Sequence, residues 1–424
     1  MGSTLRSADV CLTLPYPVPC MPGRRSRWLR SAMPHQLEAS SQGVSHKMRF
    51  IAQRHDRLET VEGTWRQFEA AGSTTAFQRF DWMKGIATYL SGPAKGRPFV
   101  VEVRDAFTGQ SFLLLPLILI QKFGHRVIEY LSLGVCDISL PIVAPGHVFS
   151  EEEGTSLWQA IVAVLPKADL INIGRIPRVM GGTVNPLAML PCVYPIAMEG
   201  FAVKLNGDPS TIVDRITNGQ TRRILKTSKR RLEELGPVRL MVADTDADLG
   251  ALLTVMISQR LERFRQLDRF DPLGVPHVQE FYKAAAFAGL KGENPARAFG
   301  LAVGDETIAT AYGLVNGDTF HLIILSMADG IWRSCSPGTA IVAQLIRWAR
   351  EERFTTMDFS IGELTYKKGF GGQASALYAL ERPFTVRGKA VIALRTRFDE
   401  FKRKLKSNRL LWTGLKSIIS GLRR

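Results

Sequence analysis

The stretch "RSCSPGTAIVAQLIRWAREERFTTMDFSIGELTYKKGFGG", residues 333–372, carries the order of elements that decides the fold. Ser336 is a residue type that caps helices, and Pro337 suits the first helical position because its missing N–H costs nothing there. Apolar residues then recur at helical spacing, and "TTMDFSI" at 355–361 has the composition of a strand. The sequence therefore predicts a loop, a helix and a strand in close succession, followed by a polar segment.

The start of this predicted helix has the features of an anion site. Gly338 has no side chain and Thr339 and Ala340 are small, so the N–H groups of the first turn are expected to face open space. The positive end of the helix dipole lies behind them, and Arg333 stands just upstream. We predict a diphosphate-binding group of Arg333, Ser336, Gly338, Thr339 and Ala340. A well-formed helix start without a ligand fits the same spacing.

Length and composition indicate an ordinary globular protein. The chain has 424 residues, of which 45% are hydrophobic and 22% are charged, so two domains with substantial cores are expected. The longest apolar run, "FLLLPLILI" at 112–120, is about half the roughly 18 residues of a membrane span and reads as a buried strand. Five scattered cysteines and the lack of a secretory signal favour a cytoplasmic location.

The net charge of +16 is concentrated in particular segments. Residues 391–424 hold ten Lys and Arg against two acidic residues, and residues 1–47 hold six against two. The stretch "TRRILKTSKRR" at 221–231 contributes six more basic residues. Because the charge lies in the two ends and one helix face, the high pI is weak evidence for nucleic-acid binding.

Element order divides the chain into four parts. Residues 1–47 lack hydrophobic periodicity and are expected to be a disordered arm. Residues 48–200 and 201–390 each show a helix, an antiparallel meander, a second helix and a further strand. An internal duplication explains this repeat, and two unrelated α/β domains of similar order are the alternative. Residues 391–424 have the pattern of a basic amphipathic helix.

Five stretches together resemble one known family. They are "TTAFQRFDW", the "LLPL" strand, "RRILKTSKRRLEELG", "SPGTAIVAQLIRWA" and "MDFSIGELTYKKGFG". This set is similar to the CelD-type family of GNAT-like acetyltransferases, which is tied to bacterial cellulose and exopolysaccharide synthesis. The resemblance covers about residues 48–385, and the last two stretches are the most specific.

The resemblance implies an α/β (α+β) fold with tandem GNAT-like domains and mixed, mostly antiparallel sheets flanked by helices. It also implies an acyltransferase that uses acyl-CoA, with acetyl-CoA as the expected donor. The family's usual phosphate loop reads Gln/Arg-x-x-Gly-x-Gly/Ala. Only the Gly-x-Ala part survives here, at Gly338 and Ala340, so CoA as the donor is an inference from the family.

The polar segment after the predicted strand carries the residue types that acyl transfer needs. An acceptor amine or hydroxyl must lose a proton, for which Asp358 or Glu363 is the predicted base, and Tyr366 is the predicted acid for the departing thiolate. Asp137 and Lys367 are predicted to bind the acceptor. A structural role fits the same residues: a turn-forming aspartate, a packed tyrosine and a surface lysine.

The first half has a different sequence at the helix start that corresponds to residues 336–340. Ser150 and Glu153 fit a capping box, and three consecutive carboxylates there would repel a phosphate, so residues 48–200 are not expected to bind CoA. The histidines show no metal-type spacing and are expected to be structural, so no metal is predicted.

Two basic segments leave other functions open. The predicted helix around 221–231 is most simply a solvated face, although a CoA 3′-phosphate, an anionic saccharide or tRNA would suit it. Fem-type aminoacyl-tRNA-dependent transfer is therefore one rival function, and a non-catalytic scaffold of a polysaccharide-synthesis complex is another. The tail from about Arg395 is expected either to lie on the inner face of an anionic membrane or to dock on the protein's own surface.

Overall fold

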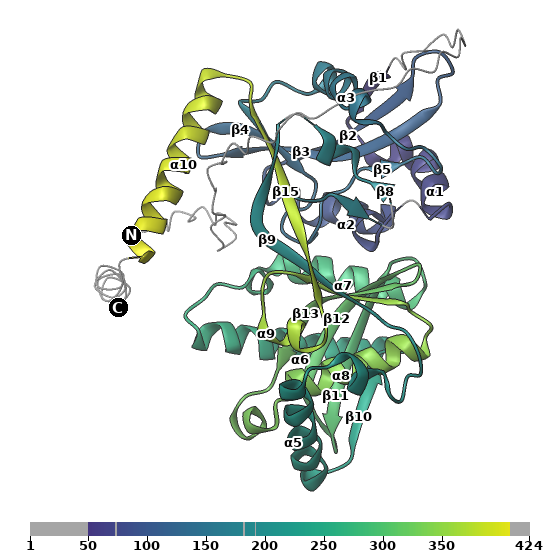
Figure 1. Ribbon diagram of the computed structural model, residues 1–424, viewed down its shortest axis with the longest axis vertical. Coiled ribbons are helices and arrows are strands. Elements are labelled where there is room, and N and C mark those ends of the chain that lie inside the picture. The colour runs from purple at the N-terminus through teal and green to yellow at the C-terminus, as the bar shows by residue number, and fades with distance from the viewer. Residues whose placement is uncertain (1–49, 73, 181–182, 191, 408–424) are drawn as a thin grey trace, which may run out of the picture.

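The computed structural model describes residues 50–407 apart from 73, 181–182 and 191. The expected arm at 1–47 and most of the basic tail lie outside this part. One 13-stranded sheet runs through the molecule in the order β1-β2-β3-β4-β6-β15-β9-β14-β13-β12-β11-β10, with β5 attached to β3. Figure 1 shows the first half of the chain above, the second half below, and two long strands passing between them.

The first half is built on an antiparallel meander followed by a parallel strand. The meander strands are β1 (Phe50–His55), β2 (Arg97–Asp105), β3 (Ser111–Lys122) and β4 (His125–Tyr130). The next strand, β6 (Leu170–Pro177), pairs with β4 in parallel. The other elements are η1 (Leu58–Val61), α1 (Glu62–Ala70), η2 (Ala76–Gln78), α2 (Phe80–Tyr89), β5 (Ile142–Val143), α3 (Glu151–Val164), β7 (Val179–Met180), β8 (Thr183–Val184) and η3 (Pro186–Met189).

The second half repeats this plan. Its meander strands are β10 (Val238–Val242), β11 (Ala296–Val303), β12 (Glu306–Asn316) and β13 (Thr319–Met327). The next strand, β14 (Thr356–Ile361), pairs with β13 in parallel. The other elements are α4 (Ile212–Ile216), α5 (Gly219–Leu235), α6 (Asp246–Gln266), η4 (Pro272–Gly274), α7 (Pro276–Leu290), η5 (Gly330–Cys335), α8 (Pro337–Glu351), α9 (Thr365–Gly369) and α10 (Val386–Ser407).

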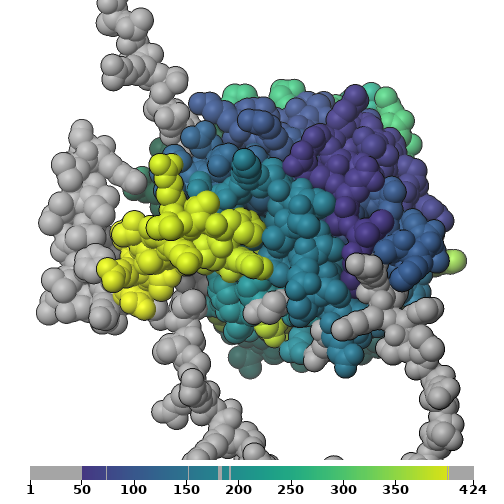
Figure 2. Space-filling view, turned by 90° about the horizontal axis from the view of Figure 1, so that it is seen from above, coloured from purple at the N-terminus to yellow at the C-terminus, as the bar shows by residue number. Residues whose placement is uncertain are grey.

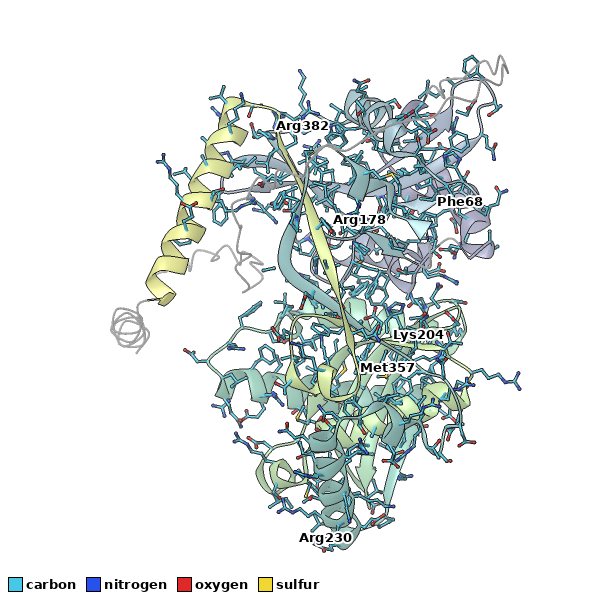
Figure 3. The ribbon with its side chains drawn as sticks, in the orientation of Figure 1. Phe68, Arg178, Lys204, Arg230, Met357 and Arg382 are labelled. Carbon is cyan, nitrogen blue, oxygen red and sulfur yellow. The ribbon has the colours of Figure 1, made fainter. Side chains whose placement is uncertain are left out.

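The last strand of each half lies between the two halves. β9 (Val193–Lys204) pairs with β14, and β15 (Gln373–Pro383) pairs with both β6 and β9. At the end of β9, Lys204 Nζ donates to Thr356 Oγ1 at 3.0 Å, whereas near the end of β15 the Arg382 guanidinium lies 5.6 Å from the Trp158 ring of α3. Figure 3 shows Lys204 beside Met357 in the lower half and Arg382 in the upper half. Each half thus receives a strand from the other.

This topology confirms the expected fold class, a mixed and mostly antiparallel sheet with flanking helices. The predicted division into residues 48–200 and 201–390 falls inside β9. That division remains a proposal, because β9 and β15 tie the two parts into one sheet.

Helices of the two halves also share a hydrophobic core. Trp82 on α2 and Phe281 on α7 are fully or almost fully buried, and their rings meet edge to face with centroids 4.8 Å apart. The predicted buried strand "FLLLPLILI" forms most of β3 and lies almost entirely inside this core. A second core lies between the other face of the sheet in the second half and α8. The halves are therefore packed together, and residues at their junction are held in place from both sides.

The C-terminal helix begins at Val386, five residues before the predicted start of the basic segment. Figure 2 shows α10 on the surface of the molecule, beside the first half. Arg395 on α10 makes an ion pair with Glu381 on β15. No helix in the described part of the chain is both long and apolar enough to cross a membrane.

Candidate functional site

The parallel strands β13 and β14 separate next to the predicted polar segment. They share only three register pairs, of which His321 with Asp358 is the last. Beyond this pair β13 continues to Met327, while β14 is irregular between Asp358 and Ile361. Ser360, inside this irregular segment, has a left-handed φ of 68°, which a serine rarely adopts and which turns the strand out of its ladder. The two strands therefore form a fork, and His321 and Asp358 lie at its base.

His321 and Asp358 are directly bonded at the base of the fork. His321 Nδ1 lies 2.9 Å from Asp358 Oδ2, and the side chains are 4% and 19% exposed. The second carboxylate oxygen, Oδ1, accepts the Ser360 N–H at 2.7 Å. The ring of Phe77, on η2 of the first half, lies edge-on 5.4 Å from the imidazole. The pair is therefore fixed by contacts from both halves.

Asp137 reaches this point from the loop after β4. Its Oδ2 accepts a hydrogen bond from the Ser360 hydroxyl, across 223 positions of sequence. Burial raises the pKa of Asp137, and the charge of Asp358 adds to that shift, whereas the Ser360 hydrogen bond and the charges of Arg175 and Lys367 oppose it. The first half thus places a carboxylate beside the second half's polar segment.

Lys367 on α9 completes the group. Its side chain is only 2% exposed, and its Nζ donates to the carbonyls of Ser360 and Ile361 at 3.2 and 2.7 Å. Burial lowers the pKa of Lys367 to about 8, although Asp137 and Asp358 oppose this shift. The alternative of a surface lysine is therefore wrong. We call Asp137, His321, Asp358, Ser360 and Lys367 the junction cluster.

Two other predicted residues lie apart from the junction cluster. Glu363 is exposed and pairs with Lys368 at 2.5 Å, and this contact lowers the pKa of Glu363. Tyr366 packs edge-on against Phe359, with ring centroids 6.2 Å apart, and burial raises the pKa of its phenol. Because neighbouring strand residues face opposite sides of a sheet, Tyr366 packs on the side of β14 opposite to Asp358.

The start of α8 differs in detail from the prediction. Pro337 occupies the first helical position as expected, but Ser336 is left-handed with φ 52° and its side chain makes no capping hydrogen bond. Its carbonyl accepts the N–H groups of Thr339 and Ala340 instead. The prediction that Ser336 caps α8 with its side chain is therefore wrong. In the first half, by contrast, Ser150 and Glu153 form the complete capping box that the sequence predicts.

Gly338 lies against the side chain of Met327 at this helix start. A Cβ at this position would lie 2.6 Å from Cε of Met327, the last residue of β13. The predicted open space over Gly338 is thus partly filled by the methionine side chain. A thioether end is flexible, so a ligand would displace it at little cost.

The basic helix α5 lies beside the same loop. Ser228 Oγ donates to the carbonyl of Cys335 at 2.5 Å, and Arg231 Nη1 donates to the carbonyl of Ser334 at 2.6 Å. Arg333 is exposed on η5, directly before Ser334 and Cys335. Two arginines therefore flank the start of α8. Figure 3 shows Arg230 at the lower tip of the molecule, far from Met357 on β14.

Two hollows among the described residues lie away from the predicted site residues. One of about 310 Å³ is lined by Phe149, Arg178, Val184, Ala188 and Met189. Another of about 300 Å³ is lined by Thr64, Gln67, Phe68, Glu102, Arg104, Gly109, Gln110, Ser111, Ala144 and Pro145. Both are in the first half, and neither is lined by a predicted site residue. Within the described residues, no three His, Cys, Asp or Glu side chains gather as metal ligands would.

Sequence comparison matches one segment of the second half to a known family. Residues 219–368 match the family described as "Acetyltransferase (GNAT) domain". The matched segment runs from α5 to α9 and contains the start of α8 and every member of the junction cluster except Asp137. The resemblance to the GNAT superfamily is therefore confirmed for this segment, and such a domain indicates an acyltransferase enzyme. No curated protein matches the chain.

Solved structures give distant matches over most of the chain. FemX shares 10% identity over 70% of this chain and 94% of its own, with a TM-score of 0.45. L-PGS from Bacillus licheniformis shares 12% over 81% and 97%, with a TM-score of 0.46. A tandem GNAT protein from the clavulanic acid biosynthesis pathway shares 12% over 79% and 98%, with a TM-score of 0.42. Because all three TM-scores are below 0.5, they add no argument to the strand topology described above.

Proposed function

We propose that this protein transfers an acyl group, acetyl in the simplest case, from acyl-CoA to an amine or hydroxyl acceptor. The observation that carries the proposal is that one GNAT-matched segment contains both the start of α8 and the fork between β13 and β14. A helix start favours anions, and the fork brings Asp358 and Lys367 of the same segment close to each other.

The diphosphate of acyl-CoA would bind at the start of α8. No side chain caps this helix, and Arg231 and Arg333 supply positive charge beside it. The equivalent start in the first half is closed by its own capping box. We therefore assign acyl-CoA to the second half alone, with residues Arg333, Ser336, Gly338, Thr339 and Ala340 around the phosphates.

Acyl transfer needs a group that takes a proton from the acceptor and a group that returns one to the thiolate. Asp358 lies at the base of the fork, and Asp137 and Lys367 lie beside it, which supports a role for these residues in proton transfer and acceptor binding. Tyr366 keeps its proton because burial raises its pKa, as an acid for the thiolate requires. The exposed ion pair of Glu363 with Lys368 gives Glu363 no such support.

The acceptor class follows from the family resemblance of residues 48–385. CelD-type proteins are tied to cellulose and exopolysaccharide synthesis, so we propose a saccharide precursor as the acceptor. A cytoplasmic enzyme that acts on such precursors would work near the inner face of the membrane.

The basic tail would provide that membrane contact. Residues 408–424 lie outside the described part, while α10 is attached to the body through Arg395 and Glu381. A cut after residue 407 therefore keeps the described part of α10. We expect the full chain, but not residues 1–407, to co-sediment with vesicles containing anionic phosphatidylglycerol. Equal sedimentation of both forms would remove the membrane contact from the proposal.

One observation favours a second function. The face of α5 exposes Arg222, Arg223, Lys226, Lys229 and Arg230, which would also suit the phosphates of a tRNA. An aminoacyl-tRNA-dependent transferase would then replace the acyl-CoA enzyme.

Binding and turnover measurements separate these functions. We expect acetyl-CoA to raise the thermal unfolding temperature of the full chain, and glucosamine to release free thiol from acetyl-CoA in its presence. Absence of both effects, with salt-dependent binding of tRNA, would replace acyl-CoA with aminoacyl-tRNA. Absence of all three would leave the non-catalytic scaffold.

A further inference from the structure

The base of the fork contains a histidine that neither the family motifs nor the proposed roles include. His321 is the last residue of β13 that is paired with β14, and its Nδ1 lies 2.9 Å from Asp358 Oδ2. A carboxylate can only accept from the ring, so Nδ1 carries the N–H, and in the neutral form of the imidazole the second nitrogen carries no hydrogen. The other ring nitrogen, Nε2, then keeps a lone pair and is the nitrogen that can take a proton.

Each carboxylate oxygen of Asp358 accepts a hydrogen bond. Oδ2 is bonded to His321 and Oδ1 accepts the Ser360 amide at 2.7 Å. Ser360 reaches that position only through its left-handed φ of 68°. Strained residues of this kind persist where the surrounding structure holds them, and they gather at functional sites. The carboxylate thus holds the imidazole through Oδ2 and the Ser360 amide through Oδ1.

The corresponding position in the first half lacks this arrangement. There β4 and β6 also share three register pairs, and the last is Glu129 with Asn172. Glu129 pairs with Lys122 of β3 at 2.7 Å. Since the two halves share one plan, the histidine and aspartate are specific to the half that matches the GNAT family.

We propose that His321 is the general base of the acyl transfer and that Asp358 is its positioning residue. This inference rests on the proposed function, and it changes the role of Asp358 from base to support. Histidine is the side chain whose proton exchange lies nearest to neutral pH, which suits a base that must also release its proton in each cycle.

The proposed step balances as follows. The acceptor nitrogen or oxygen forms a bond to the acyl carbon, and its proton passes to Nε2 of His321. The bond between the acyl carbon and the CoA sulfur breaks, and the thiolate leaves. Tyr366 gives its proton to the thiolate, and the proton on the imidazole passes through solvent to restore the phenol, so the products are the acylated acceptor and free CoA.

Several charged groups lie near His321 and Asp358, and their charges affect how the rate of the enzyme depends on pH. Asp358 comes from β14, Asp137 from the loop after β4, Lys367 from α9 and Arg175 from β6. Phe77 is the neighbour from η2 and carries no charge.

Kinetics of full-length variants test the proposal, with acetyl-CoA as donor and glucosamine as acceptor. We expect His321→Asn to lower kcat by about 100-fold or more, the typical contribution of a general base, and to leave the KM for acetyl-CoA within about twofold. Asp358→Asn should lower kcat and shift the acidic limb of the pH profile, and Asp358→Glu should recover part of the loss. Glu129→Gln, the matched change in the first half, should behave like the wild type.

A second nucleophile separates catalysis from structural damage. Hydroxylamine is largely unprotonated at neutral pH, so its acylation depends less on a base. His321→Asn should therefore lose far less activity with hydroxylamine than with glucosamine. Equal losses with both nucleophiles, or full turnover of the variant with glucosamine, would overturn the assignment.

The tautomer of His321 can be read without any acceptor. In the ¹⁵N imidazole spectrum of the full chain, assigned by comparison with His321→Asn, we expect the neutral form of the ring to carry its proton on Nδ1. A ring protonated at Nε2 would refute the base even if acetyl-CoA binds and reacts. If acetyl-CoA neither binds nor reacts, the acyl-CoA function fails and the base assignment falls with it, whereas the spectrum still reports whether Asp358 fixes the ring.

Discussion

The hydroxyl of Ser360 donates a hydrogen bond to Asp137, which lies 223 positions earlier in the chain. Ser360 belongs to β14 of the second half, and Asp137 belongs to the loop after β4 of the first. The bond therefore forms only when the two halves are packed together, as the exchanged strands β9 and β15 require. It makes the first half part of the candidate site, although the GNAT match ends within the second.

A double-mutant cycle on Asp137 and Ser360 measures this bond. We expect Asp137→Ala and Ser360→Ala each to lower the free energy of unfolding, with a coupling energy of about 1.5–3 kcal/mol, because a charged acceptor strengthens a hydrogen bond. Urea unfolding of the four proteins gives the number. Ser360→Gly is the matched variant: it loses the same hydroxyl but relieves the left-handed φ, so it should cost less than Ser360→Ala. A coupling energy below about 0.5 kcal/mol would mean that the two side chains do not interact.

The arginines beside α8 should decide the affinity for acyl-CoA. Arg333→Glu and Arg231→Glu place a negative charge next to the predicted diphosphate, so each should weaken acetyl-CoA binding by about tenfold or more. Isothermal titration at fixed salt measures the change. Arg230→Glu is the control, since Arg230 lies on the same helix but is exposed and pairs with Glu234. If all three variants bind alike, the phosphates are bound elsewhere.

Gly338 tests whether this helix start is a packed surface. The Cβ of Gly338→Ala would lie 2.6 Å from the Met327 methyl, which is the flexible end of its side chain, so we expect the methyl to shift and the free energy of unfolding to fall by less than about 1 kcal/mol. In a Met327→Ala background the same substitution should cost much less, because the clashing group is gone. Thermal unfolding of the four proteins gives both values. An equal cost in both backgrounds would assign the effect to the backbone of α8.

Elements that depend only on neighbouring residues can be predicted from the sequence. Pro337 at the first helical position, the capping box of Ser150 and Glu153 and the buried β3 follow from residue type and spacing, and the structure confirms them. Ser336 was predicted wrongly because its conformation depends on contacts outside its own turn. The carbonyls of its neighbours Ser334 and Cys335 are held by α5, more than 100 positions away in sequence, and no local pattern reports that contact.

The candidate site was predicted only in part, for a similar reason. Asp137, Asp358 and Lys367 were singled out by residue type, but only the strand register and the exchanged strands bring them together. His321 was expected to be structural because histidine spacing shows nothing about a partner on a parallel strand 37 positions later. Its place near the start of a strand that a GNAT-like order puts beside "MDFSI" is the signal that the sequence offers.

The buried charge of Lys367 should make the stability of the protein depend on pH in a defined window. Burial lowers the pKa of this lysine to about 8 in the folded state, whereas an unfolded lysine titrates near about 10.4. Between these values the unfolded chain binds more protons than the folded one, so the contribution of this group to stability rises with pH through this window. Below about pH 8 both states carry the charge, and the folded state bears the full cost of burying it.

Lys367→Met removes this dependence. We expect the free energy of unfolding of the wild type, relative to the variant, to be larger at pH 9.5 than at pH 7, as measured by urea unfolding of the full chain. Lys368→Met is the control, because Lys368 is exposed and its contact with Glu363 raises its pKa, so its difference from the wild type should stay constant over the same range. If the Lys367→Met difference is also constant or falls with pH, then Lys367 keeps its full charge in the folded state. Asp137 and Asp358 would in that case hold it as an ion pair.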